Sequence, residues 1–64
     1  MTEEEMIEAA NQVDRLAGMT VNERLFASGL MDEFDRANKT DKVKARRILA
    51  LLHVGTPSID KILK

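Results

Sequence analysis

The sequence N-E-R-L-F-A-S-G-L-M-D-E-F-D-R-A-N, residues 22–38, contains both aromatic residues of the chain, Phe26 and Phe34. When this stretch is read as one α-helix, a set of apolar residues falls within an arc of about 140°, which is the width of a core-facing stripe. The members of this set are Phe26, Ala27, Leu30, Met31, Phe34 and Ala37. The pattern therefore predicts one long helix over residues 21–37, around which the rest of the chain packs.

A second, smaller apolar strip lies beside the first on the same predicted helix and includes Val21, Leu25 and Gly29. A helix with two apolar strips contacts two neighbours, so either the first helix of the same chain or another protomer covers the second strip. Gly29 falls in the middle of the predicted helix, where glycine costs about 1 kcal/mol relative to alanine. This cost indicates that another helix backbone approaches closely at Gly29.

The segment before the predicted central helix has the features of a shorter, weaker helix. Its apolar residues recur every three or four positions and are mostly alanines, which predicts a helix over residues 3–17 with little buried area. Gly18 is expected to end this helix in a left-handed conformation. The spacing of a capping box occurs at the start of this helix and again at the start of the central one. The two pairs are Thr2 with Glu5 and Thr20 with Glu23.

A third helix is predicted over residues 41–53, after a turn formed by Asn-Lys-Thr at residues 38–40. A broad apolar arc that includes Ile48 and Leu52 forms its core-facing side. His53, at the C-terminal end of this arc, is expected to be a partly buried cap that interacts with free carbonyl groups.

A fourth helix is predicted over residues 57–63, because Thr56-Pro57 has proline at the first helical position. With this helix, the patterns predict an all-α fold: a compact bundle of four short helices in a single domain, residues 1–64. The expected centre of the bundle consists of Leu30, Phe34, Ile48, Leu52 and Ile62.

The length and composition of the chain exclude several classes of protein. A chain of 64 residues forms one domain and buries only about 60% of its unfolded surface, so its stability is expected to be marginal. It has no cysteine and one histidine, which excludes disulfides and a zinc site, and we expect no cofactor. No apolar run approaches the roughly 18 residues of a membrane span, and the acidic N-terminus is not a signal peptide. These features together favour a cytoplasmic protein.

The net charge of −1 hides a strong asymmetry between the two halves of the chain. Residues 1–35 contain nine acids and two bases, and residues 36–64 contain eight bases and two acids. Several bases crowd the start of the third helix, where the helix dipole favours acids, and such departures from helix rules are often functional. The bases either pair with the acidic half of the same chain or form a patch for an acidic partner. They are Lys39, Lys42, Lys44, Arg46 and Arg47.

Three acids on the central helix, Asp32, Glu33 and Asp35, are expected to form a solvated outer face. Asp32 and Arg36 have the i,i+4 spacing of a helical ion pair. No nearby group is expected to desolvate these carboxylates, so they are not read as a catalytic pair.

The central sequence resembles a phrase found in small uncharacterised bacterial proteins. That phrase corresponds to Asn22–Asp35, here N-E-R-L-F-x-S-G-L-M-D-E-F-D. In those proteins a helix rich in isoleucine and leucine follows, and then a segment like Pro57-Ser58-Ile59-x-x-Ile62-Leu63. The resemblance covers roughly residues 20–63 and implies a bacterial, cytoplasmic helical domain, but it transfers no functional residue to this chain.

The first functional hypothesis is a non-enzymatic interaction module that forms a homodimer or binds a protein partner. The residues expected to carry this interaction come from the second apolar strip and from the basic cluster. They are Val21, Leu25, Gly29, Lys42, Arg46 and Arg47. An enzyme is not expected, because the single histidine has no serine or carboxylate at helical spacing and the chain has no cysteine.

The second hypothesis is a nucleic-acid binder. The second and third helices would then form a variant helix-turn-helix, with the bases at the start of the third helix directed toward phosphates. The net charge of −1 and the absence of asparagine and glutamine from residues 41–53 argue against this hypothesis.

Overall fold

The computed structural model describes residues 1–63, which form five α-helices, one short 3-10 helix and no β-strand. None of these helices has the length and apolar character needed to cross a membrane. The elements in chain order are α1 (Glu3–Asn11), η1 (Leu16–Gly18), α2 (Val21–Ser28), α3 (Met31–Thr40), α4 (Lys42–Leu51) and α5 (Thr56–Ile62). The prediction of an all-α fold is confirmed, whereas the prediction of four helices is wrong.

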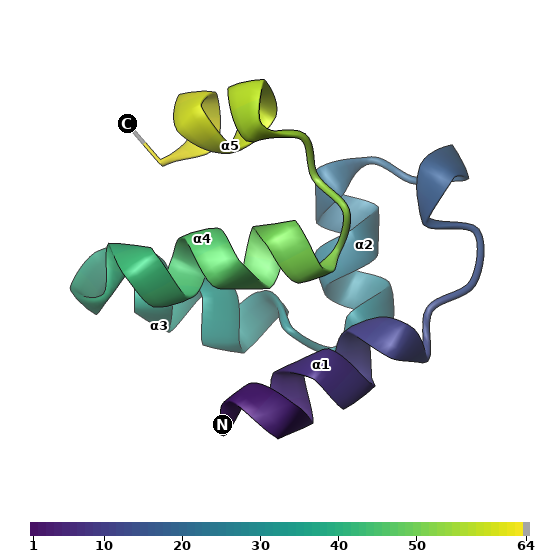
Figure 1. Cartoon of the computed structure of the whole chain (residues 1–64), viewed down its shortest axis with the longest axis horizontal. Coiled ribbons are helices and arrows are strands. Elements are labelled where there is room, and N and C mark those ends of the chain that lie inside the picture. The colour runs from purple at the N-terminus through teal and green to yellow at the C-terminus, as the bar shows by residue number, and fades with distance from the viewer. Residues whose placement is uncertain (64) are drawn as a thin grey trace.

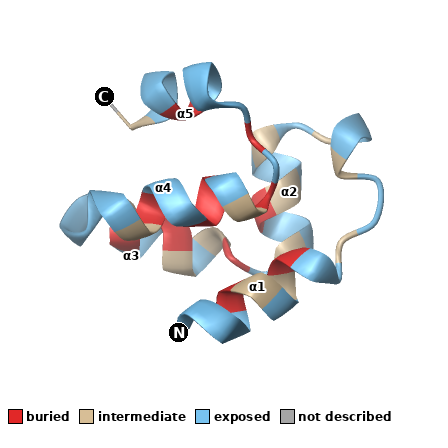
Figure 2. Ribbon diagram, in the orientation of Figure 1, coloured by how far each residue is buried: buried red, intermediate tan, exposed pale blue. Residues whose placement is uncertain are grey.

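Helix α4 lies at the centre of the fold, where α1, α3 and α5 pack against it (Figure 1). Its apolar arc is fully buried at Ala45, Ile48 and Leu49, and Leu52 continues the arc just beyond the helix (Figure 2). Helix α2 packs against α3 and α1 at the other end of the core. The central element is therefore the predicted third helix and not the stretch over residues 21–37.

The prediction of one helix over residues 21–37 is wrong because the helix ends at Gly29. The backbone of Gly29 is left-handed, with φ 77°. Its amide donates to the Phe26 carbonyl at 3.1 Å, and the Leu30 amide donates to the Leu25 carbonyl at 3.0 Å. This is a Schellman motif, and the Leu25 and Leu30 side chains that flank it are both buried. The chain then starts α3 in a new direction.

The break changes which side chains of α2 face the core. Leu25, which the single-helix reading placed outside the main stripe, is only 2% exposed. Phe26, which that reading placed in the core, is 80% exposed, and Ala27 is exposed as well. Phe34 of α3 is buried as predicted.

The N-terminal helix is shorter than predicted. Helix α1 ends at Asn11, and the chain reaches η1 through Arg15, whose backbone is left-handed with φ 61°. Gly18 lies inside η1 and is not left-handed, so the predicted cap at Gly18 is wrong. Both capping boxes are confirmed, because in each one the threonine hydroxyl accepts from the glutamate amide and the glutamate carboxylate accepts from the threonine amide.

Helices α4 and α5 lie within one or two residues of their predicted bounds. The predicted turn at residues 38–40 belongs to α3, and Asp41 alone connects α3 to α4. Four of the five predicted central residues are buried, but Ile62 is 38% exposed and Ile59 occupies the core from α5.

His53 is exposed instead of partly buried, and its backbone is left-handed with φ 62°. Its amide donates to the Ala50 carbonyl at 3.0 Å, and the Val54 amide donates to the Leu49 carbonyl at 3.0 Å. Helix α4 therefore ends in the same Schellman motif as α2, with histidine at the position where glycine is usual.

Gly29→Ala should lower the free energy of unfolding by about 1–2 kcal/mol, because alanine is strained in the left-handed conformation. A Cβ atom at Gly29 would meet no atom within 4 Å, so the predicted close helix contact at this glycine is wrong. Gly29→Asn should cost less than Gly29→Ala, since asparagine tolerates left-handed backbone. Urea denaturation of the two variants measures the difference, and a larger loss with asparagine would show that side-chain size decides.

Candidate functional site

The bases at the start of α4 are engaged within the chain. Lys42 Nζ donates to Asn38 Oδ1 at 2.7 Å, and Arg46 pairs with Asp60 of α5 at 2.9 Å. Arg47 pairs with Glu3 of α1. Asp41 caps the helix by accepting from the Lys44 amide at 3.2 Å, which places a negative charge at the positive end of the helix dipole. These contacts agree with the reading of the basic cluster as internal charge complementarity.

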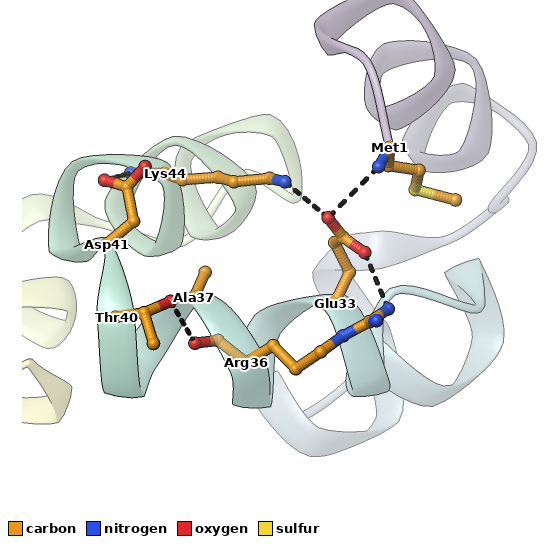
Figure 3. A pocket seen from close by; sticks show the side chains of 7 residues that line it. All are labelled: Met1, Glu33, Arg36, Ala37, Thr40, Asp41 and Lys44. Carbon is orange, nitrogen blue, oxygen red and sulfur yellow. Dashed lines mark hydrogen bonds and ion pairs between the residues drawn. The ribbon is translucent and has the colours of Figure 1, made fainter.

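Glu33 of α3 is the acid with the largest number of cationic partners among the described residues. Its carboxylate accepts from Lys44 Nζ at 2.5 Å, from Arg36 at 3.0 Å and from the Met1 amino group at 3.4 Å (Figure 3). The Glu33 side chain is 12% exposed, so the prediction of a solvated outer face is wrong at this residue. Arg36 pairs with Glu33 instead of Asp32.

These partners favour the ionised form of Glu33. The hydrogen bond from Lys44 is the largest cause that lowers the pKa of Glu33 below its ordinary value of 4.5, and the positive charges of Lys44 and the amino group act in the same direction. A hollow of about 310 Å³ borders this cluster (Figure 3). Because the carboxylate stays ionised and is surrounded by donors, its chemistry is that of a structural anion and not of a general acid.

Glu33→Gln should make stability less dependent on pH in the acid range. A folded-state pKa below 4.5 means that the stabilisation from ionised Glu33 is present above that pH and is lost as the pH falls. Denaturant titrations between about pH 6 and pH 3 should show a shallower decline for Glu33→Gln than for the parent chain. Glu8→Gln, which removes a carboxylate with no ion pair in residues 1–63, is the matched control. Equal slopes for the two variants would contradict the assignment.

Arg24 of α2 points inward and has a structural role that the sequence patterns did not predict. Its Nε donates to the Met19 carbonyl at 3.1 Å, and its Nη1 donates to the carbonyls of Leu52 and His53, each at 3.1 Å. The signal that would have found it is its spacing, three residues after Val21 and four before Ser28, which places Arg24 on the half-buried side of α2. A base on that side must reach polar groups, and here they are the free carbonyls at the end of α4.

The chain itself covers part of the second apolar strip. Leu25 lies in the hydrophobic core, Val21 packs against that core and is half-buried, and Gly29 is exposed. Helices α1 and α3 pack against α2, and Arg24 also links α2 to the end of α4. The structure does not bring Val21, Leu25 and Gly29 together with Lys42, Arg46 and Arg47 at one exposed site.

An exposed apolar surface lies on the outer side of α2. Phe26 projects from it at 80% exposure, beside a hollow of about 420 Å³. We call this surface the Phe26 face. It is lined by Met19, Asn22, Glu23, Phe26, Ala27 and Met31. Sequence reasoning missed it, because a continuous helix would have turned Phe26 toward the core.

A second exposed apolar residue, Val43 at 81%, borders a hollow of about 480 Å³ between α1 and α4. Charged groups, including the Glu3–Arg47 ion pair, line much of this hollow. It is therefore more polar than the Phe26 face and offers a partner less apolar surface.

No protein-family model, curated protein or solved structure matches the chain. The resemblance to small bacterial proteins stays a prediction. Among residues 1–63, no group of three histidine, cysteine, aspartate or glutamate side chains is placed to hold a metal ion. The exposed Phe26 face is therefore the feature from which function is best argued.

Proposed function

We propose that this protein is a small, non-enzymatic helical module that binds another protein chain through the Phe26 face. The observation that carries the proposal is the 80% exposure of Phe26 beside an apolar hollow. Full burial of a phenylalanine is worth about 1.5–3 kcal/mol, and the isolated chain leaves this gain unused. A partner that covers Phe26 gains this free energy of burial on binding, and aromatic side chains are enriched in protein interfaces for the same reason.

The methionines support the same function. Met19 and Met31 flank Phe26 and are half-buried, so each has part of its side chain free to move. Unbranched methionine side chains adapt to the shape of a partner and are common at protein-binding surfaces. A phenylalanine anchor with methionines at its sides therefore suits the docking of a protein better than the binding of a small polar ligand.

The alternative, a nucleic-acid binder that uses the basic start of α4, has less support. Lys42, Lys44, Arg46 and Arg47 each contact a side-chain oxygen within the chain. Phosphate binding would have to displace these partners, which reduces the gain from each contact. The proposed setting is the bacterial cytoplasm, as the resemblance implies.

Site-specific photocrosslinking tests the proposal. A benzophenone-bearing phenylalanine replaces Phe26 in one variant and the exposed Lys61 of α5 in a control, and both are irradiated in bacterial cells. We expect one discrete adduct from position 26, either with a second copy or with one partner, and none of that mass from position 61. An excess of unlabelled parent chain should suppress the adduct, whereas an excess of Phe26→Asp should not. The same adducts from both positions would overturn the proposal, as would none from position 26.

A further inference from the structure

The Phe26 face is apolar in its middle and acidic at its edge. Among residues 1–63, Glu23 is the only charged residue that lines the hollow. On α3, Asp32 follows Met31 directly, and Asp35 lies one turn beyond Met31 on the same side of the helix. Both aspartates are exposed, and neither forms an ion pair within residues 1–63. One carboxylate therefore lines the hollow, and two more lie close to Met31 along α3.

No base forms an ion pair with these acids in the described part of the chain. Arg24 donates to three backbone carbonyls on the inner side of α2, and Arg36 pairs with Glu33. Lys39 lies four residues after Asp35, about 6 Å along α3, and Arg15 lies four residues before Met19; neither base makes an ion pair in the described part of the chain. The three acids outnumber Arg15 and Lys39 near the face, so a partner with bases around an apolar centre complements it.

A second copy of this chain complements the face poorly. A two-fold symmetric dimer places the same surface on both subunits, so the acidic edges would meet and repel each other. A head-to-tail arrangement needs a cationic surface, but the bases at the start of α4 already contact Asn38, Glu33, Asp60 and Glu3. These charges favour a different protein as the occupant.

The occupant is expected to bind as a helix. Residues 1–63 contain no β-strand, so the face has no sheet edge with which an extended peptide could form backbone hydrogen bonds. An extended segment on an apolar surface would leave its amide and carbonyl groups unpaired, at a cost of about 1–3 kcal/mol for each group that is removed from water. An α-helix satisfies its own backbone groups and presents apolar side chains along one side.

We infer that the Phe26 face binds a cationic amphipathic helix of another protein. This inference rests on the proposed function. An apolar side chain of the partner helix enters the hollow of about 420 Å³ beside Phe26. Lysine or arginine side chains on either side of it lie against Glu23, Asp32 and Asp35. The methionines adjust to the shape of the apolar side chain.

Two helical peptides that differ only in charge test the inference. Each has about 20 residues, long enough to form a helix when stapled, with leucines on one side and either lysines or glutamates on the other. Titration into the ¹⁵N-labelled protein should give shift changes for Asn22, Ala27 and Met31 with the lysine peptide. The glutamate peptide should bind at least about 10-fold more weakly, a difference of 1.4 kcal/mol.

Three variants identify the contacts. Phe26→Ala should weaken the lysine peptide by about 10–30-fold, as expected for an interface anchor. Asp32→Asn with Asp35→Asn should weaken it by about 5–10-fold at low salt and less at high salt. Glu4→Gln with Glu8→Gln, which also removes one carboxylate from the first turn and one from the middle of an α-helix, should change affinity less than about 2-fold.

The remaining outcomes separate this inference from the proposed function. Equal binding of both peptides at the Phe26 face would overturn the inference of a cationic partner but support the proposed function. The chain could instead bind neither peptide but self-associate in a concentration-dependent way that Phe26→Asp abolishes. This result would also overturn the inference and support the proposed function, because the occupant would then be a second copy. Chemical-shift changes confined to α1 would overturn the inference, since the peptide would then bind to acidic side chains of α1 and not to the Phe26 face. If neither peptide binds, the chain does not self-associate and position 26 gives no adduct, both the inference and the proposed function are overturned.

Discussion

Phe34→Ala should lower the free energy of unfolding by about 3–5 kcal/mol, whereas Phe26→Ala should change it by less than about 0.5 kcal/mol. Phe34 is 7% exposed in the core that α3 forms with α4, and its truncation leaves a cavity there. Phe26 is 80% exposed and loses little contact when truncated. A chain of 64 residues is expected to have a total stability of about 3–10 kcal/mol, so Phe34→Ala removes much of it.

Urea denaturation followed by far-UV circular dichroism measures both variants. We expect a weak or missing cooperative transition for Phe34→Ala and a transition close to that of the parent chain for Phe26→Ala. The same change at the two phenylalanines makes them matched controls for each other. A larger loss for Phe26→Ala than for Phe34→Ala would mean that α2 faces the core with its other side, as a continuous helix over residues 21–37 requires.

Local patterns predicted where the helices begin more accurately than where the helix that starts at Val21 ends. The capping boxes at Thr2 and Thr20 depend on residues three positions apart, so the sequence alone identifies them. Gly29 permits two readings, a costly glycine inside a helix or a left-handed residue that ends it. In a continuous helix, Leu25 and Leu30 would lie about 140° apart and face different sides. The Schellman motif buries both, and this gain in burial decides between the two readings.

The orientation of α2 depends on whether the helix ends at Gly29, and the exposure of Phe26 at the candidate site depends on that orientation. With a continuous helix, Phe26 aligns with Phe34 and is buried; with the break, Phe26 faces outward and Leu25 faces inward. The exposure of Phe26 could therefore not be predicted from its place in the sequence alone. The charge asymmetry left internal pairing and an acidic partner both open. Arg47 and Glu3 are 44 residues apart, so only the tertiary fold determines which acid meets which base.

Arg24→Ala should lower the free energy of unfolding by about 1.5–3 kcal/mol, the usual range for hydrogen bonds that involve a charged group. The variant removes the donors from three carbonyls, those of Met19, Leu52 and His53. Two of these carbonyls follow the last residues of α4, so the Arg24 side chain ties α2 to the end of the central helix. The left-handed backbone at His53 should be the first part of the fold to loosen.

Arg24→Lys separates geometry from charge at this position. Lysine keeps a positive charge near the C-terminus of α4, which the helix dipole favours by about 0.3–1 kcal/mol, but it lacks the planar fork that reaches carbonyls in different directions. We therefore expect Arg24→Lys to recover only a minor part of the loss. Arg36→Ala is the control, because Arg36 is an exposed base in one surface ion pair and should cost less than about 1 kcal/mol. Hydrogen exchange of the His53 and Val54 amides should accelerate in both Arg24 variants and stay unchanged in Arg36→Ala. If Arg24→Lys is as stable as the parent chain, the dipole alone accounts for Arg24, and the three hydrogen bonds contribute nothing measurable.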